Sequence, residues 1–254
     1  MTSTSSVRPG MSHQRADAAR RVADLVRFDI HSGRFGEHLP YEWDLLTRYG
    51  SSRAVLREAL ARLRDQGVLR RMPGIGTLRR VDSTAISLTQ VAAPLQVVDA
   101  ESGSVEEIDE SRMLVETIVH QRSKAPLPVA EALAIAPGDP VLFTESLIHV
   151  DGSPHRLRSS WIPLDRLPGL DVAVPGRYPI RVLRDLLRAP LLTRRFLVEA
   201  VAADESVAAY LGIPAGAALL LSERVIHTKG GLPVEFGFTR HRGDRSHVLA
   251  NSAC

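Results

Sequence analysis

The sequence predicts an α+β protein in two parts, a small helical N-terminal part and a larger part built on an antiparallel sheet with flanking helices. Three observations predict this. Helical patterns fill residues 16–66, alternating runs such as VLFTESLIHV and ALLLSERVIH occupy the second half, and residues 129–152 resemble residues 207–230. With 254 residues, 44% of them hydrophobic, the chain can bury a sizeable core.

Three helices and a two-stranded wing are expected in the N-terminal part. The first helix is predicted over residues 16–31, where apolar residues recur every three or four positions until a Ser-Gly stop. A second short helix is predicted over 41–49. The third is expected to begin at Ser52, a favourable N-cap, and to reach Gln66 before a glycine. In the following segment, VLRRMPGIGTLRRV, two short strands flank a Pro-Gly turn.

The expected domain boundaries follow changes in composition. They are a loose tail at 1–15, a first domain at 16–81, a linker at 82–111 and a second domain at 112–250. The linker is rich in small and acidic residues, without sustained periodicity, and one or two strands are expected in it. Short helices are expected near 128–134, 179–188 and 204–211.

The internal repeat predicts the architecture of the second domain. At an offset of 78, residues 129–152 and 207–230 share ten identities. Each copy contains a short helix, a glycine-containing turn, a long strand, a hairpin turn and a return strand. Two such units that pair their strands would form one antiparallel sheet with helices on a face.

Charge is divided unevenly between the two parts. Residues 1–82 contain 15 Arg and 9 acidic residues, whereas the rest of the chain contains 17 basic and 20 acidic residues. This segregation favours a polyanion that meets only the first part, because arginine pairs with phosphate and reads guanine bidentately. A genome that favours arginine codons is the alternative, but it explains the excess of arginine and not the segregation of sign.

The third helix has the side-chain pattern of a DNA-reading helix. Arg53, Arg57 and Arg64 project on one side, and leucine and alanine side chains cover the neighbouring arc. Because the helix follows a shorter one and precedes a wing, Arg53 and Arg57 are the candidates to read guanine in the major groove. Wing arginines would contact phosphates or the minor groove; they are Arg70, Arg71, Arg79 and Arg80. The alternative is a solvated arginine face on an ordinary helical hairpin.

Residues 16–81 resemble the winged helix-turn-helix of GntR-type bacterial transcription regulators. The resemblance rests on Leu39-Pro40, Ser52-Arg53, the Arg57-Glu58-Ala59-Leu60 run, Gly67 and the Gly74-x-Gly76-Thr77 wing turn. It implies operator DNA binding as a homodimer, with Ser52, Arg53, Arg57, Arg64, Arg71, Gly76, Thr77 and Arg79 as the DNA-binding residues. Two departures are Tyr41 and Trp43, where the family commonly has Ser and Arg, so one usual DNA contact is missing.

The second half is similar to the UTRA effector-binding domain of the HutC branch of that family. The similarity rests on LGIPAG, ALLLSERVIH, GLPVE and RGDR, and it implies a fold like that of chorismate lyase. Family members that bind phosphosugars carry two arginines and a glutamate where this chain has Ser146, Ile148 and Arg158. A phosphosugar effector is therefore not supported.

The candidate effector-binding residues are Arg158, Glu235, Arg240 and His241. Arg158, Glu235 and His241 are expected to line a pocket that prefers a carboxylated or otherwise polar small molecule. An ordinary surface ion pair between Arg158 and Glu235 is the alternative. The repeated His149 and His227 are expected to be structural equivalents. A local salt bridge between Asp244 and Arg245 is expected to cap the sheet.

Together these features predict a cytoplasmic, homodimeric transcription regulator, most simply a repressor that holds an inverted-repeat operator and responds to a small molecule. An enzyme of chorismate-lyase-like fold and a ligand-free interaction domain are the alternatives. The chain lacks the common nucleophile, metalloprotease and nucleotide-binding motifs, and its single cysteine is Cys254, so no catalytic residue, metal or cofactor is expected. Neither a secretory signal nor an apolar stretch of membrane-spanning length is present, and no membrane partner is expected.

Overall fold

The computed structural model describes residues 11–72, 76–79, 96–99, 112–167, 182–183, 186–188 and 191–249. The chain divides into two compact units, Met1–Val81 and Asp82–Cys254. Within the described residues no helix is both long enough and apolar enough to cross a membrane.

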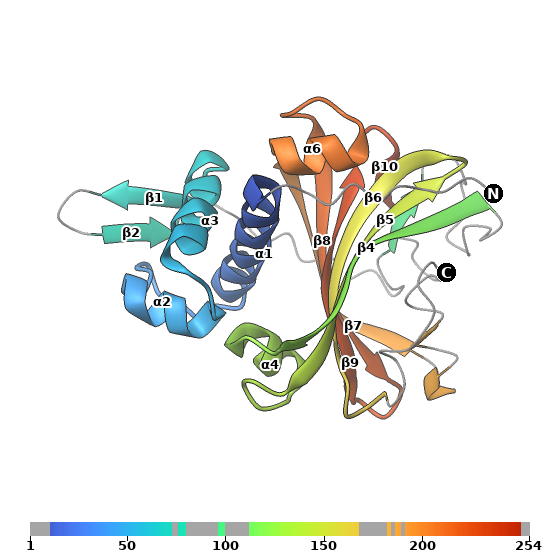
Figure 1. Cartoon of the computed structure of the whole chain (residues 1–254), viewed down its shortest axis with the longest axis horizontal. Coiled ribbons are helices and arrows are strands. Elements are labelled where there is room, and N and C mark those ends of the chain that lie inside the picture. The colour runs from blue at the N-terminus through green and yellow to red at the C-terminus, as the bar shows by residue number, and fades with distance from the viewer. Residues whose placement is uncertain are drawn as a thin grey trace. The chain divides into compact units, whose positions relative to one another are not determined.

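The first unit contains three helices and a two-stranded antiparallel wing (Figure 1). They are α1 (Met11–His31), α2 (Glu42–Tyr49), α3 (Arg53–Asp65), β1 (Leu69–Met72) and β2 (Gly76–Arg79). The predicted helices and wing strands are confirmed. The first helix begins five residues earlier than predicted, because residues 11–15 contain no glycine or proline and continue the helix beyond its apolar pattern.

Apolar packing and one polar cluster fix the helices of the first unit. Leu45 of α2 and Leu56 and Leu63 of α3 are fully buried. Asp29 of α1 accepts two hydrogen bonds of 2.6 Å from the Arg48 guanidinium and one of 2.8 Å from the Tyr49 hydroxyl. Burial and the Asp29 carboxylate raise the pKa of Tyr49, so the phenol stays protonated and donates. This cluster holds α2 on α1.

The second unit is built on a six-stranded antiparallel sheet in the order β4-β5-β6-β9-β8-β7. Its strands are β4 (Met113–Lys124), β5 (Pro140–Val150), β6 (Ser153–Pro163), β7 (Leu191–Ala202), β8 (Ala218–Thr228) and β9 (Pro233–Arg242). The helices are α4 (Leu127–Leu133) and α6 (Glu205–Leu211). A separate pair joins β3 (Gln96–Asp99), a strand in the predicted linker, to β10 (Ser246–Leu249). In the predicted helical stretch near 179–188, residues 182–183 and 186–187 are helical and residue 188 is in a turn, whereas 179–181 and 184–185 lie outside the described residues.

The internal repeat is confirmed as the plan of the sheet. The bounds of β4, α4 and β5, moved by 78 positions, are those of β7, α6 and β8. Backbone hydrogen bonds repeat at the same offset: Ala125 N–H donates to Asp139 O, and Ala203 N–H donates to Ala217 O. The return strands β6 and β9 pair with each other at the centre, so the two halves meet in one continuous sheet.

The two faces of the sheet carry different side chains, because successive residues of a strand point to opposite sides. On the helix face, α6 packs against a cluster that includes Leu147, Leu157 and Leu219. Its equivalent α4 packs against β9 at the other end of the strands (Figure 1). The opposite face contains Arg156, Arg158, Glu235 and His241 and is called the arginine face below. One of its ends is closed by apolar residues; they are Leu142, Ile162, Leu167, Val182 and Leu183.

Candidate DNA interface and effector site

Helix α3 presents two arginines to solvent from its first two turns. The Ser52 hydroxyl caps the helix by accepting from the Val55 backbone N–H at 3.4 Å. Leu56 is buried beneath the helix, whereas the side chains of Arg53 and Arg57 are 68% and 65% exposed. Arg64 is on the same side two turns later and is half-buried. The sequence prediction of one packed side and one arginine side is thus confirmed.

A single carboxylate of α2 contacts both exposed arginines. Glu42 Oε1 lies 3.0 Å from Arg53 Nε and 3.2 Å from Arg57 Nε. Arg57 Nη2 also donates to Glu42 Oε2 at 3.4 Å. Sequence reasoning missed Glu42, because its contacts depend on how α2 crosses α3 and no spacing within one helix reveals them. Glu42 therefore bridges the two guanidinium groups.

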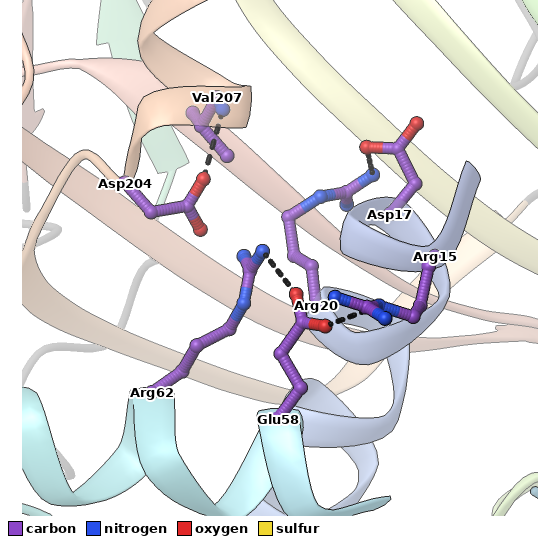
Figure 2. A network of polar contacts seen from close by, with 7 residues as sticks. All are labelled: Arg15, Asp17, Arg20, Glu58, Arg62, Asp204 and Val207. Atoms are coloured by element: carbon purple, nitrogen blue, oxygen red, sulfur yellow. Dashed lines mark hydrogen bonds and ion pairs between the residues drawn. The ribbon is translucent and has the colours of Figure 1, made fainter. Parts of the chain in front are cut away.

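The residue after Arg57 anchors α3 to α1. Figure 2 shows Glu58 between Arg15 of α1 and Arg62 of α3, with contacts of 3.0 Å and 3.3 Å. Adjacent residues of α3 thus have different roles, since Arg57 faces solvent and Glu58 attaches α3 to α1. In the second unit, Figure 2 also shows the Asp204 carboxylate capping α6 by accepting from the Val207 N–H at 3.0 Å.

The wing adds exposed cations to the first unit. Arg71 pairs with Thr77 in the β1–β2 ladder, and both Arg70 and Arg71 are exposed. The Leu39 N–H donates to the Thr77 carbonyl at 3.0 Å and ties the segment before α2 to the wing. For Gly76 and Arg79 only the backbone pairing is described, opposite Met72 and Leu69. The candidate residues Gly74 and Arg80 lie outside the described residues.

Arg158 and Glu235 form an ion pair on the arginine face of the second unit. Their side chains are 2% and 0% exposed, so the alternative of a surface pair is wrong. Arg224 Nη2 lies 3.8 Å from the same carboxylate oxygen of Glu235. Glu235 Oε2 and Arg224 Nε are buried without a hydrogen-bond partner among the described residues. Two guanidinium groups therefore approach one buried carboxylate.

The repeat explains why Arg224 belongs to this cluster. Arg224 is the equivalent of Ser146 at the offset of 78, and both residues lie on the arginine face. Ser146 is opposite Arg158, and Ile148 is opposite Arg156. The guanidinium that position 146 lacks is thus present at the equivalent position of the other half. Sequence reasoning missed Arg224, although the repeat offset was the signal that could have found it.

His241 belongs to the same face and is held neutral. Its Nε2 lies 3.2 Å from the Ser222 hydroxyl oxygen. Burial lowers the pKa of His241 well below its ordinary value, and the positive Arg156 and Arg158 and the neighbouring His155 lower it further. A neutral imidazole offers one donor and one acceptor, whereas a protonated imidazole offers only donors. The neutral form therefore suits a polar ligand that both donates and accepts.

Arg240 is separated from the other three candidates. It faces Leu157 and Leu221 across the ladders and so lies on the helix face, whereas His241 beside it lies on the arginine face.

The expected Asp244–Arg245 salt bridge is absent from the contacts found in the described residues, and Asp244 instead pairs with Arg242 at 2.7 Å. That hydrogen bond lowers the pKa of Asp244. Arg242 is the better partner because it ends β9, directly before the turn.

His149 and His227 are structural equivalents, as predicted. Each lies at a register shift of its hairpin, between Ile148 and His149 in one half and between Ile226 and His227 in the other. His149 Nε2 lies 3.2 Å from a Glu116 carboxylate oxygen. In the described part of the chain, no three His, Cys, Asp or Glu side chains are grouped so that they could hold a metal ion.

Comparison with known proteins gives two domain matches. Residues 18–78 match the gntR family of bacterial regulatory proteins, and residues 111–247 match the UTRA domain. A relative from Escherichia coli, named as a probable fructoselysine utilization operon transcriptional repressor, is 25% identical over 88% of each chain. The Escherichia coli mannosyl-D-glycerate transport/metabolism system repressor MngR is 28% identical over 59% of this chain and 60% of its own.

A solved structure has the same fold. The possible transcriptional regulator YydK from Bacillus subtilis superposes with a TM-score of 0.52 and 16% identity, over 92% of this chain and 99% of its own. This likeness supports the predicted order of a helical winged unit followed by an antiparallel sheet unit.

Proposed function

Because the chain belongs to the GntR family of bacterial regulatory proteins and carries a UTRA domain, we propose that it is a homodimeric, effector-responsive repressor of an inverted-repeat operator. Membership of that family makes it a DNA-binding transcriptional regulator and not an enzyme. We assign DNA binding to residues 16–81, which follow a loose tail at 1–15. Effector binding and dimerisation are assigned to residues 112–250, and residues 82–111 are the linker between the two domains. We place its action in the cytoplasm, where operator DNA is found, and within the HutC branch.

The observation that carries DNA reading is the pair of exposed arginines on α3. Arg53 and Arg57 lie one helical turn apart near the helix N-terminus, and Glu42 contacts both. A helix of this kind enters the major groove with its N-terminal residues toward the bases, and arginine pairs bidentately with guanine O6 and N7. The wing cations Arg70 and Arg71 would then contact the backbone beside the groove.

The effector is a small molecule with a carboxylate or a similar polar group. Arg158 and Arg224 offer two guanidinium groups on a buried face, and guanidinium binds carboxylate with charge-assisted hydrogen bonds. A hydroxyl group of such a ligand would also donate to the buried Glu235 Oε2, which is costly to leave without a partner. The glycerate in the name of the MngR system carries such a carboxylate. Arg240 is left out of this pocket because it lies on the helix face.

Effector binding would change operator affinity by favouring one arrangement of the two DNA-reading units in the dimer over another. Only an effector with different affinities for the two arrangements can do this. A coupling free energy of about 1 to 3 kcal/mol would change operator affinity roughly 5- to 150-fold.

The test of DNA reading is fluorescence anisotropy of the full chain on its own upstream DNA at two salt concentrations, against a scrambled duplex of equal length. Preference for the native duplex that persists at the higher salt is expected. Equal and steeply salt-dependent binding to both duplexes would leave only a basic patch.

The test of the effector pocket is a thermal-shift screen with hydroxy acids, including glycerate, and their uncharged amides as matched controls. An acid that stabilises the parent chain should fail to stabilise the Arg158→Ala and Arg224→Ala variants. Arg112→Ala, which removes an exposed ion pair with Asp151, should respond like the parent. An unchanged response of Arg158→Ala would contradict the proposed pocket.

A further inference from the structure

Two aromatic side chains are exposed where α2 begins. Tyr41, the residue before α2, is 79% exposed, and Trp43 in its first turn is 67% exposed. These are the two most exposed large hydrophobic side chains among the described residues. Large aromatic side chains exposed close together in the sequence can indicate a contact surface, because water solvates such rings poorly.

The backbone under this aromatic pair is well anchored. Leu45 and Tyr49 of the same helix are buried, and the Tyr49 hydroxyl donates to Asp29 of α1. The Thr47 hydroxyl donates to the Trp43 carbonyl at 3.1 Å within the helix. The exposed position of Trp43 is thus fixed by a helix that cannot turn to bury it.

The aromatic pair lies next to the DNA-reading arginines. Tyr41 and Trp43 flank Glu42, and the Glu42 carboxylate contacts Arg53 at 3.0 Å and Arg57 at 3.2 Å. Tyr41 and Trp43 therefore lie one residue on either side of the carboxylate that contacts both recognition arginines. Any duplex that reaches Arg53 and Arg57 comes close to this corner.

Charge at this corner does not by itself attract DNA. Glu42 and Asp44, which alternate with the aromatic residues, would repel phosphates at long range, so the approach of DNA depends on the neighbouring Arg53 and Arg57. An aromatic ring can still gain contact with a deoxyribose or a thymine methyl group without any charge. The indole N–H and the phenol O–H can in addition donate to a phosphate oxygen.

We propose that Tyr41 and Trp43 form an uncharged contact to the operator, with their rings on deoxyribose or thymine methyl groups and their polar tips on phosphate, beside the bases read by Arg53 and Arg57. This proposal rests on operator binding by the first unit. Because the contact carries no charge, it strengthens binding without releasing a counterion. At the position of Trp43, where the family commonly has arginine, the aromatic contact would replace a charged contact, and its salt dependence would be weaker.

The chain offers a direct probe, since it has two tryptophans. Trp161 is 4% exposed and packs among Phe143, Phe236 and Phe238 in the second unit, whereas Trp43 is exposed in the first. We would titrate the full chain with its upstream duplex and record tryptophan emission, acrylamide quenching and the anisotropy of a labelled duplex. The Trp43→Phe variant isolates the emission of Trp161.

The expected result is that emission changes and acrylamide protection follow the anisotropy curve with one midpoint, and that both vanish in Trp43→Phe. Trp43→Ala should weaken operator affinity about 5- to 10-fold with an unchanged salt slope. Trp43→Arg should instead raise the salt slope by about one unit. All three variants should melt like the parent, because the replaced side chain is exposed.

Two outcomes would overturn the proposal, and they differ. If the parent bound the operator while Trp43 kept its emission and its acrylamide access, the aromatic contact would be wrong and DNA reading would stand. If the parent bound neither the native nor the scrambled duplex, the proposed function would fail together with the contact.

Discussion

Arg158 and Glu235 form a buried ion pair although they are 77 residues apart in the chain. The pair crosses the β6–β9 junction, where the two repeated halves of the sheet meet. It therefore exists only when both halves are in register. Breaking a buried pair on one side leaves an uncompensated charge in a medium of low polarity, which costs more than the loss of a surface bridge.

We expect Arg158→Met and Glu235→Gln each to lower the free energy of unfolding of the second unit by about 3 to 5 kcal/mol. The double variant should be less destabilised than the sum of the two, because it leaves no charge of the pair alone. Denaturant unfolding followed by the emission of Trp161 reports on this unit, since Trp161 is buried there. Single variants within about 1 kcal/mol of the parent would show that the pair is not energetically coupled to the fold.

Arg53→Ala and Arg57→Ala should each weaken operator binding by about 1 to 3 kcal/mol and relax the preference for the operator sequence. The reason is the loss of a bidentate contact to guanine by an exposed guanidinium. Anisotropy on the operator and on duplexes with single base changes measures both effects. Arg112→Ala removes an exposed arginine from the second unit and serves as the matched control. Parent-like binding by either α3 variant would make the assignment of the recognition helix wrong.

Glu42→Gln should raise affinity for scrambled DNA and reduce the ratio of specific to nonspecific binding. The carboxylate repels phosphate, so its loss strengthens nonspecific binding. Glu42 also holds two guanidinium groups in the free protein. A long side chain that is first ordered on binding costs roughly 0.5 to 1.5 kcal/mol, and Glu42 would reduce this cost for both arginines. Anisotropy on native and scrambled duplexes at one salt concentration gives the ratio. An unchanged ratio would mean that Glu42 does not position the arginines.

The sequence predicts the repeat because its identities fall on turns and on inward positions of α4, β5, α6 and β8. It does not predict that β4 and β7 flank these units, since residues 113–124 and 191–202 share almost no identities, although β4 pairs with β5 and β7 with β8 in equivalent registers. The strand period of two places Arg240 and His241 on opposite faces of the sheet, and this separation is predictable from the sequence alone. Glu42 is different, because only the packing of α2 on α3 brings it to Arg53.

His241 should make the folded chain lose stability as the pH falls below about 6.5, the ordinary pKa of histidine. Its pKa is lowered in the folded state by burial and by Arg156, His155 and Arg158, so the unfolded chain binds a proton that the folded chain does not. Stability then falls with decreasing pH by up to about 1.4 kcal/mol per pH unit until the folded pKa is reached, and it is unaffected above the ordinary value. We would measure unfolding free energies between pH 7.5 and 5.5 for the parent and for His241→Gln, whose amide keeps a polar group near Ser222. The unfolding free energy of the parent, relative to that of His241→Gln, should fall toward pH 5.5. A constant difference in unfolding free energy would show that His241 does not titrate differently in the folded and unfolded states.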